Sequence, residues 1–437
     1  MNVEIQEGPI ASRINHSELI KDWLVYDKVF WRQGRYSKER HTYKKKLLDK
    51  RGNFLSGFVP KIKKYLELKG HIVGITVDTG KEGMSFFRWP ELKDITFRED
   101  QRKAIDEILT YGRGIWKAPT GSGKTILIAA IVKAYSSSTL ILVHTKTLLK
   151  QTREELARWD LKADVLMKQS FSNAVKDTPR DYYDVVIVDE AHHVSSFESQ
   201  YAKILMYLEA SIRIGFTATT YDKTKESYLA MEGLLGPVIG ETSYEEVKEI
   251  LAKPKMKFIK VPEMGDKAKK KLKGKYQFVY DQGIVKNRKR NQLIVEEAER
   301  NIKKGKSVLL MVERIEHGDI LLELCEVAMP GVFTFLSAED DNKKLDGETK
   351  AFKEGKRKGV IASRIWGEGL NIKRINVVIN AVGGKSEIAA IQRFGRGLRK
   401  DEGKIDVLLV DMLDTNHTYF QRHAMERLCF YSDIGWL

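Results

Sequence analysis

The sequence predicts an α/β protein in which two successive parallel-sheet domains follow a small basic α+β domain. From about residue 91, short apolar runs alternate with amphipathic segments, as in a parallel sheet covered by helices on both faces. The same alternation restarts after about residue 285, whereas a glycine-rich phosphate-binding pattern occurs in the first region alone. We therefore expect domains over residues 1–90, 91–252 and 253–437.

Composition limits the class of protein. The 437 residues are 42% hydrophobic and 31% charged, which is ordinary for a globular protein with substantial cores. No apolar run reaches the roughly 20 residues of a membrane span, and the N-terminus lacks the pattern of a signal peptide. Cys325 and Cys429 are far apart, so a disulfide or zinc site is not expected and a cytoplasmic location is.

Net charge indicates the kind of partner. Lysine and arginine number 76 against 60 aspartate and glutamate residues, which gives a net charge of +16. Such an excess favours a polyanion, most often nucleic acid, and plain solubility is the alternative. Two stretches, residues 31–51 and 253–276, hold most of the excess.

The first basic stretch interleaves aromatic rings with cations. Cations can contact phosphates while flat rings stack on bases, so we expect this stretch to bind nucleic acid. The side chains expected to make these contacts are Trp31, Arg32, Arg35, Lys44, Lys45 and Lys46. A merely solvated basic face is the alternative.

The rest of the N-terminal region predicts short elements. We expect strands over residues 47–48 and 54–59 and an amphipathic helix over residues 61–69. The side chains expected to face inward from this helix are Ile62, Tyr65, Leu66 and Leu68.

The second basic stretch, residues 253–276, has a high lysine density and no apolar periodicity, which predicts an exposed loop or hairpin. A solvated linker and a DNA contact both remain open there.

Apolar runs locate the elements of the two α/β regions. In the first, we expect helices over residues 126–134 and 146–158 and strands over residues 139–144, 183–189 and 211–216. In the second, we expect strands over residues 307–312, 331–336, 359–362, 375–379 and 405–410.

Residues 118–125, Ala-Pro-Thr-Gly-Ser-Gly-Lys-Thr, fit the pattern G-x-x-x-x-G-K-[ST] with alanine in place of the first glycine. Gly121 and Gly123 allow backbone amides to turn toward phosphate oxygens. Lys124 supplies a charge for the β- and γ-phosphates, and the Thr125 hydroxyl is a ligand for Mg²⁺.

The whole loop is expected to surround the nucleotide, including Pro119, Thr120 and Ser122. The apolar run 126–132 predicts a helix whose positive N-terminal end faces the phosphates. A glycine turn before a core helix is the alternative.

Two adjacent acids, Asp189 and Glu190, end the apolar strand expected over residues 183–189. Open α/β sheets bind their ligands at the carboxyl ends of the strands. We expect Asp189 to hold Mg²⁺ through water and Glu190 to polarise the attacking water. Adjacent acids after a strand are common by chance, and the preceding phosphate loop favours the catalytic interpretation.

The order of these motifs resembles that of superfamily 2 helicases. Residues similar to motifs I, Ia, II, III, the motif IV region, V and VI are 118–125, 143–148, 189–192, 215–219, 311–318, 367–372 and 392–399. The resemblance covers roughly residues 95–435 and implies two tandem RecA-like domains that hydrolyse ATP with Mg²⁺.

The resemblance also implies roles around the nucleotide. Gln101, with Arg98 nearby, stands where the family reads adenine, and Gln392 stands where it positions water. Arg396 and Arg399 are implied to reach the γ-phosphate from the second domain, where a guanidinium neutralises developing charge.

Further positions are implied to couple domain closure to the bound strand. Gly369, with Glu368, is implied to respond to the nucleotide, and Thr217 and Thr219 to link the acids to the strand-binding surface. The residues implied to contact nucleic acid in the two α/β regions are Thr145, Lys146 and Ser363.

Asp-Glu-Ala-His with Thr-Ala-Thr differs from the motifs of DEAD-box RNA helicases, and a basic N-terminal domain before a minimal motor is similar to phage UvsW-type DNA helicases. That resemblance implies branch migration at forks and Holliday junctions in recombination and repair, in the host cytoplasm if the chain is phage-encoded. Ala118, Asn371 and Ser337-Ala-Glu339 depart from the family pattern without removing a catalytic side chain.

Three other functions remain open. They are an RNA-directed ATPase of the same superfamily, a double-strand DNA translocase that does not separate strands, and a DNA-binding module with a vestigial nucleotide site. The intact Lys124, Asp189 and Glu190, with Arg396 and Arg399, count against the last of these.

Overall fold

In the computed structural model the chain forms two compact units. The first contains residues 1–119 and 123–243, and the second contains residues 244–437, with which loop residues 120–122 are grouped. The residues it describes are 1–33, 38–77, 87–119, 121–174, 177–218, 226–247, 249–250, 253–263, 276–337, 339–363, 375–384, 406–433 and 436–437. Within these ranges, each helix is too short or too polar to cross a membrane. The domain bounds expected from the sequence stay predictions.

The first unit begins with a mixed sheet in the order β5–β2–β1–β6, in which β1 pairs antiparallel with β2 and parallel with β6. Its elements are β1 (Asn2–Glu7), β2 (Ala11–Ile14), β5 (Asn53–Leu55), α1 (Val59–Leu68) and β6 (Ile72–Val77). Ile62 and Leu66 of α1 are buried in the core of this sheet with Val3 and Ile5.

Two expectations for this region were wrong. Residues 47–48 form a bend, and β5 ends at Leu55 because a 3-10 turn, Ser56–Phe58, follows at once. Leu68 is 79% exposed, since a residue two positions after the buried Leu66 lies about 200° around a helix with 3.6 residues per turn. Ile62, Tyr65 and Leu66 do pack inward, as expected.

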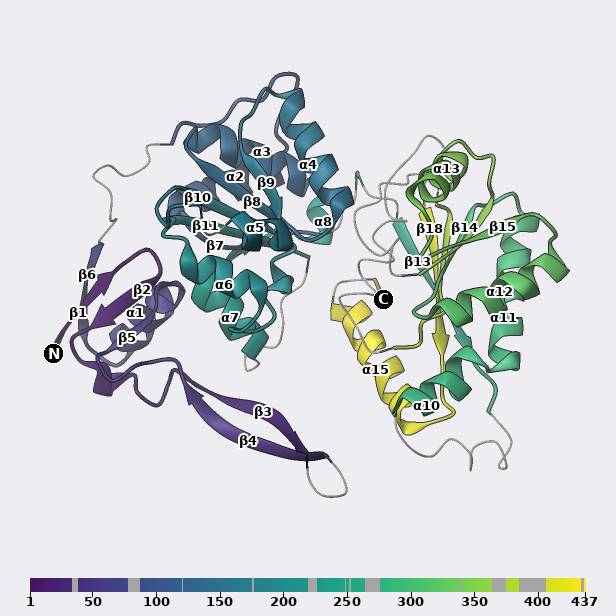
Figure 1. Cartoon of the computed structure of the whole chain (residues 1–437), viewed down its shortest axis with the longest axis horizontal. Helices are drawn as coiled ribbons and strands as arrows, with labels where there is room; N and C mark the ends of the chain where they lie inside the picture. The colour runs from purple at the N-terminus through teal and green to yellow at the C-terminus, as the bar shows by residue number, and fades with distance from the viewer. Residues whose placement is uncertain are drawn as a thin grey trace. The chain divides into compact units, whose positions relative to one another are not determined.

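The first basic stretch forms an antiparallel hairpin that the sequence did not predict. It consists of β3 (Val25–Gln33) and β4 (Lys38–Lys46), paired from Val25↔Lys46 to Gln33↔Lys38, and Figure 1 shows it as a long two-stranded ribbon. The buried ring of Tyr26 packs against Phe197, and Lys28 forms an ion pair with Glu198. These contacts anchor the hairpin within the first unit.

The first α/β region contains, among the described residues, a six-stranded parallel sheet in the order β12–β7–β11–β10–β8–β9. Its strands are β7 (Arg113–Lys117), β8 (Thr139–Val143), β9 (Asp164–Met167), β10 (Val185–Asp189), β11 (Ile212–Thr217) and β12 (Val238–Glu241). The strands expected over residues 139–144, 183–189 and 211–216 are confirmed.

Helices cover both faces of this sheet (Figure 1). One face packs against α2 (Glu99–Tyr111), α3 (Lys124–Tyr135) and α4 (Lys146–Arg158), and the other against α5 (Lys168–Ala174), α6 (Gln200–Tyr207) and α7 (Glu226–Leu235). Ile141 and Leu142 point to opposite cores, as successive strand residues do. Burial on both faces explains why the central strands β8 and β10 are nearly continuous apolar runs.

The second unit repeats this architecture. Its described residues form a six-stranded parallel sheet in the order β13–β18–β17–β14–β16–β15. The strands are β13 (Lys253–Lys260), β14 (Val308–Met311), β15 (Phe333–Leu336), β16 (Gly359–Ala362), β17 (Val377–Asn380) and β18 (Asp406–Leu413). The predicted fold class, two parallel sheets after a small α+β region, is confirmed.

The helices of the second unit also lie on both faces of its sheet. One core is formed with α11 (Arg288–Lys303) and α12 (Ile315–Ala328), and the other with α13 (Asn342–Lys353) and α15 (Thr418–Asp433). The short helices α8 (Tyr244–Val247) and α10 (Tyr276–Tyr280) belong to the same unit.

Residues 253–260 are not the exposed loop that the sequence predicted. They form the edge strand β13, which pairs with β18 from Lys253↔Asp406 to Lys260↔Leu413. Met256 and Phe258, which alternate with lysines along the strand, pack against the core. The many lysines had hidden this alternation of apolar and polar residues, which is typical of a strand. Lysines on an edge strand also oppose pairing with another chain. Residues 264–275 of the same basic stretch lie outside the described residues.

Candidate active site

The phosphate loop connects β7 to α3 and depends on two glycines. Gly121 and Gly123 have φ angles of 89° and 100°, in the region that L-residues avoid. A Cβ at Gly123 would also lie 2.8 Å from Nε2 of Gln101. At the start of the loop, the backbone N–H of Ala118 donates to the carbonyl of Thr217 over 2.9 Å. The loop is therefore fixed to β11 and leads into the N-terminus of α3, where unpaired N–H groups favour anions.

Lys124, the first residue of α3, reaches the acidic tip of β10. Its Nζ lies 2.9 Å from Oε1 of Glu190, and the two side chains are 11% and 13% exposed. Glu190 has a left-handed backbone (φ 55°, ψ 57°), and its N–H donates to Oδ1 of Asp189 over 3.0 Å. A left-handed glutamate is strained, so its neighbours must hold it in place.

The pKa values of the two acids are shifted in opposite directions. Burial, together with the charge of Glu190, raises the pKa of Asp189. Burial also acts to raise the pKa of Glu190, but the Lys124 ammonium, followed by His192, outweighs it and lowers that pKa. Of the two acids, Glu190, which lies beside the lysine of the phosphate loop, therefore gives up its proton more readily.

The donor set at this tip suits Mg²⁺. The described residues contain no group of three or more His, Cys, Asp or Glu side chains that could enclose a metal ion. Mg²⁺ uses one or two carboxylates together with phosphates and water, so Asp189 and the Thr125 hydroxyl fit its chemistry. The assignment of these two ligands remains a prediction.

Gln101 lies against the phosphate loop. Its Oε1 accepts from the backbone N–H of Arg98 over 3.2 Å, while the Arg98 side chain holds Asp100 through two hydrogen bonds of 2.8 Å. Nε2 of Gln101 is buried and makes no hydrogen bond within the part of the chain that the structure describes. A buried donor without an acceptor is costly, which supports the expected contact with a ligand.

His192 connects the acidic tip to the next strand. Its Nδ1 lies 3.1 Å from Oγ1 of Thr217 and 3.4 Å from Oε2 of Glu190. Sequence reasoning missed two further rings at this place. The rings of His144 and His193 are tilted by 34° with centroids 4.1 Å apart. The sequence signals were the place of His144 in the stretch 143–148 and that of His193 next to the acidic motif.

Several expected site residues lie outside the described residues, and their roles stay predictions. They are Arg35, Thr120, Thr219, Glu368, Gly369, Asn371, Gln392, Arg396 and Arg399. Trp31 and Arg32 lie in β3, and at these two positions the structure describes the backbone alone.

The described residues that were expected to contact nucleic acid have two kinds of environment. Lys44 and Lys46 are exposed on β4 and Lys146 on the first turn of α4, whereas Lys45 is half-buried. Thr145 is the N-cap of α4, and its hydroxyl accepts from the N–H of Leu148 over 3.2 Å. Ser363, directly after β16, is buried.

The second unit has a buried ionic network that the sequence did not predict. Arg290 forms two hydrogen bonds to Asp414, of 2.7 and 3.2 Å, and donates to the carbonyl of Ala381 over 2.8 Å. Arg427 forms two hydrogen bonds to Asp411, of 2.8 and 3.2 Å. Arg427 also donates to the carbonyl of Gly384 over 2.8 Å. The segment between β17 and residue 385 is thus held by buried guanidinium groups.

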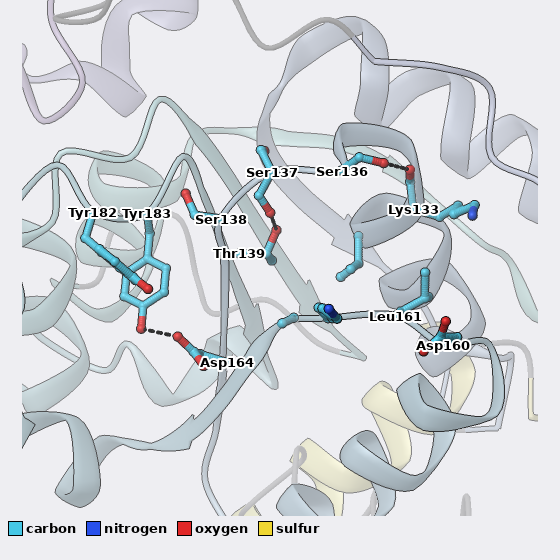
Figure 2. A pocket seen from close by; sticks show the side chains of 13 residues that line it. Lys133, Ser136, Ser137, Ser138, Thr139, Asp160, Leu161, Asp164, Tyr182 and Tyr183 are labelled. Atoms are coloured by element: carbon cyan, nitrogen blue, oxygen red, sulfur yellow. Dashed lines mark hydrogen bonds between the residues drawn. The ribbon is translucent and has the colours of Figure 1, made fainter.

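A pocket of about 700 Å³ opens at the other edge of the first sheet, near the amino ends of β8, β9 and β10 (Figure 2). Lys133, Ser138 and Tyr182 are among its lining residues. The phosphate loop and both acids lie at the carboxyl ends of the strands, so this pocket is separate from the candidate active site.

Comparison with known families identifies the two α/β regions. Residues 94–174 and 160–222 match the type III restriction enzyme res subunit, and residues 286–401 match the helicase conserved C-terminal domain. The matches follow one another in the order of the two sheets. The chain belongs to superfamily 2 of the helicases. It is an ATP-dependent helicase or ATPase of that superfamily with two tandem RecA-like domains.

Curated proteins that are distantly similar to this superfamily 2 chain include a phage helicase and an archaeal translocase. The ATP-dependent DNA helicase uvsW of Enterobacteria phage T4 is 22% identical over 378 residues, which cover 76% of this chain and 74% of the relative. The DNA 3'-5' translocase XPB2 of Sulfurisphaera tokodaii is 22% identical over 401 residues, 80% of this chain and 89% of the relative.

A solved structure shares the fold. The ATP-dependent type ISP restriction-modification enzyme LlaBIII bound to DNA aligns with a TM-score of 0.56 at 15% identity. The alignment covers 86% of this chain and 32% of that enzyme. At this identity the likeness concerns the fold alone.

Proposed function

We propose that this superfamily 2 protein is a DNA helicase that remodels branched DNA, such as forks and Holliday junctions, in recombination, replication or repair. The observation that carries the proposal is the 2.9 Å contact between Lys124 of the phosphate loop and Glu190 of the acidic tip. It joins a phosphate-binding group to a group that can polarise water. The names of the two curated relatives, a DNA helicase and a DNA translocase, support DNA as the substrate.

The proposed chemistry follows from an exchange of partners at Lys124. When ATP binds, its β- and γ-phosphates compete with Glu190 for the Lys124 ammonium. Glu190 is then free to accept a hydrogen bond from the attacking water. Mg²⁺ held by Asp189 and Thr125 would neutralise charge on the phosphates. Arg396, Arg399 and Gln392 of the second unit are proposed to complete the site.

The proposed DNA surface includes the basic hairpin. Lys44 and Lys46 lie two residues apart on β4, so they project from the same face, and both are exposed. Contacts of this kind bind backbone phosphates, so binding should tolerate any sequence and weaken steeply with salt. Trp31, Arg32 and Arg35 of the same basic stretch are proposed to add stacking and further charge.

One comparison of substrates tests the proposal. ATP turnover and strand displacement are measured side by side on a Holliday junction, a fork, a blunt duplex and a single-stranded RNA. We expect both activities to be highest on the junction and the fork. Equal activity on all three DNA substrates would contradict the branch-specific function, and greatest stimulation by RNA would contradict DNA as the substrate.

A double-strand DNA translocase is the second candidate, because one curated relative is named a DNA translocase. In that case the blunt duplex should stimulate ATP turnover fully while no strand is displaced. A streptavidin block on the blunt duplex distinguishes the two. A double-strand translocase should displace it in an ATP-dependent manner, whereas a branch-specific helicase should act little on a duplex without a branch.

A further inference from the structure

Three histidine rings form a continuous row between two strand ends of the first unit. His144 directly follows β8, whereas His192 and His193 lie in the 3-10 turn Ala191–His193 after β10. The centroids of His144 and His193 are 4.1 Å apart, at an interplanar angle of 34°. Those of His193 and His192 are 4.5 Å apart, at 35°. His193 is thus the middle ring of the row.

The first end of the row reaches the catalytic acid. His192 places Nδ1 3.4 Å from Oε2 of Glu190 and 3.1 Å from Oγ1 of Thr217. His192 and Thr217 are buried, so this contact is shielded from water. Glu190 holds a left-handed backbone conformation, which makes its position depend on such neighbours.

The other end of the row reaches the surface. The residue after His144 is Thr145, whose hydroxyl caps α4, and the next residue is the exposed Lys146. A phosphate bound at the N-terminus of α4 would contact this turn directly. The row therefore spans the distance between a proposed strand-binding turn and the proposed catalytic base.

A flat ring at position 193 is suited to passing a displacement between its neighbours, and not only to filling space in the core. Flat rings in contact cannot shift independently, because close-packed groups pass a displacement to their neighbours. Tyr201 lies on a further side of His193, with centroids 6.3 Å apart and the ring planes within 17° of parallel. His193 is confined by three rings, and a movement of His144 reaches His192 through it.

We propose that His193 is a positioning residue that couples strand binding at Thr145 and Lys146 to the placement of Glu190. The coupling acts through the packed rings, and it rests on the proposed function, in which DNA stimulates ATP hydrolysis. His193 touches neither the nucleotide nor the strand in this proposal.

The test replaces His193 in the full chain and measures ATP turnover with and without forked DNA. In His193→Ala, we expect the stimulation by DNA to fall about tenfold, while the Kd for forked DNA and the KM for ATP change less than twofold. In His193→Phe, which keeps a flat ring, most of the stimulation should return.

A second pair of variants keeps the test decisive if His193→Ala fails to fold. His193→Leu fills the same space without a flat ring, so it should fold and still lose the stimulation that His193→Phe retains. Stimulation at the wild-type level in His193→Leu or His193→Ala would overturn the proposal. Equal losses in the Phe and Leu variants would overturn transmission by ring packing.

The same strand offers a matched control. Tyr182 and Tyr183 form a ring pair just before the amino end of β10, with centroids 4.8 Å apart, and the Tyr183 hydroxyl donates to Asp164 over 2.8 Å (Figure 2). Tyr182→Ala removes one ring from this pair, far along the strand from Glu190, and should leave the stimulation intact. A loss in Tyr182→Ala equal to that in His193→Ala would overturn the proposal.

The wild-type protein in the same assay separates the two proposals. If forked DNA does not stimulate wild-type turnover at all, the proposed function fails. If wild type is stimulated and His193→Ala is stimulated equally, the ring row alone fails.

Discussion

The two parallel sheets both carry charged side chains near the carboxyl ends of their strands, but the environments of these charges differ. In the first sheet, Lys124 and Glu190 keep about a tenth of their side-chain surface exposed. In the second, Arg290 and Arg427 are 0% and 1% exposed, and each forms two hydrogen bonds to an aspartate. One sheet leaves its charges within reach of a ligand, whereas the other encloses them.

This difference in exposure separates charged groups that can bind a ligand from charged groups that stabilise the backbone around them. A partly exposed pair can exchange its partner for a phosphate, as proposed for Lys124. A fully buried pair gains little net stability over an apolar pair, yet breaking it is costly. In the second unit, the enclosed guanidinium groups hold the carbonyls of Ala381 and Gly384. Those carbonyls directly precede the segment predicted to carry Arg396 and Arg399.

The largest effect is expected when a buried pair is broken. Asp411→Ala leaves Arg427 without its carboxylate, which should lower the free energy of unfolding of the second unit by about 3–5 kcal/mol. Urea unfolding and hydrogen exchange of β17 and β18 measure this loss. Glu354→Ala removes the partner of Lys356 on the surface of the same unit, where solvent screens the pair, so the loss of stability should be much smaller. Similar losses in both variants would contradict the comparison.

The next effect concerns the reactive pair. Lys124→Ala should lower ATP turnover at least about 100-fold, because one preorganised charge on the transferring phosphate is lost, while DNA affinity stays close to wild type. The matched control is Lys133→Ala, which removes an exposed lysine from the last turn of the same helix. Turnover at the normal rate in Lys124→Ala would refute the phosphate-binding role.

An effect of pH is expected from His317, which is buried in the second unit with Nε2 3.0 Å from Oδ1 of Asn291. Burial, with a smaller contribution from Arg290, lowers the pKa of His317 from 6.5 to about 3. The unfolded chain therefore takes up a proton below pH 6.5 that the folded chain does not. The stability contributed by neutral His317 is complete above pH 6.5 and is lost as the pH falls toward 3, by about 1.4 kcal/mol per pH unit.

Urea unfolding of the second unit at pH 6.5 and pH 5 measures this slope. In His317→Gln the free energy of unfolding should depend less on pH, by the contribution of one proton. His16→Gln, on the first unit, should leave this pH dependence unchanged. An unchanged slope in His317→Gln would show that other groups cause the acid sensitivity.

The smallest effect concerns the geometry of the phosphate loop. Gly123→Ala meets two costs, a φ of 100° and a contact of 2.8 Å with Gln101. Gly305→Ala, at φ 74° with no atom within 4 Å of the new Cβ, meets the first cost alone, about 1–2 kcal/mol. Gly123→Ala should therefore be the less stable of the two and should also weaken ATP binding. Equal stability of the two variants would show that Gln101 moves aside freely.

The sequence predicted those parts of the fold whose pattern is local. β10 and β16 are buried on both faces, so each appears as a continuous apolar run. β13 and the hairpin of β3 and β4 were missed because lysines among their apolar residues hide the alternation of a strand. Leu68 was wrongly expected to face inward, because residues two positions apart, such as Leu66 and Leu68, lie on different sides of a helix.

In the candidate site too, the sequence predicted the features made by neighbouring residues and missed those made by residues far apart in the chain. The phosphate loop and the acidic pair depend on the spacing of neighbouring residues, so the sequence contains their signal. Arg290 and Asp414 are 124 positions apart, and only the folded sheet brings them together. The ring row of His144, His192 and His193 likewise needs β8 and β10 to be adjacent, which no spacing within the chain indicates.

The pairing of β13 with β18 has a consequence for synthesis of the protein. β13 is the first strand of the second sheet along the chain and β18 the last of its described strands, yet they are hydrogen-bonded neighbours. The first unit can fold once residues 1–243 have left the ribosome, since domains fold as they emerge. The pairing of β13 must wait until residues 406–413 arrive, because its hydrogen-bonded neighbour is β18 and a long loop has to close to join the two strands. A nascent chain that stalls before that point would display an unpaired strand edge to other chains, and its lysines would then serve as its protection during translation.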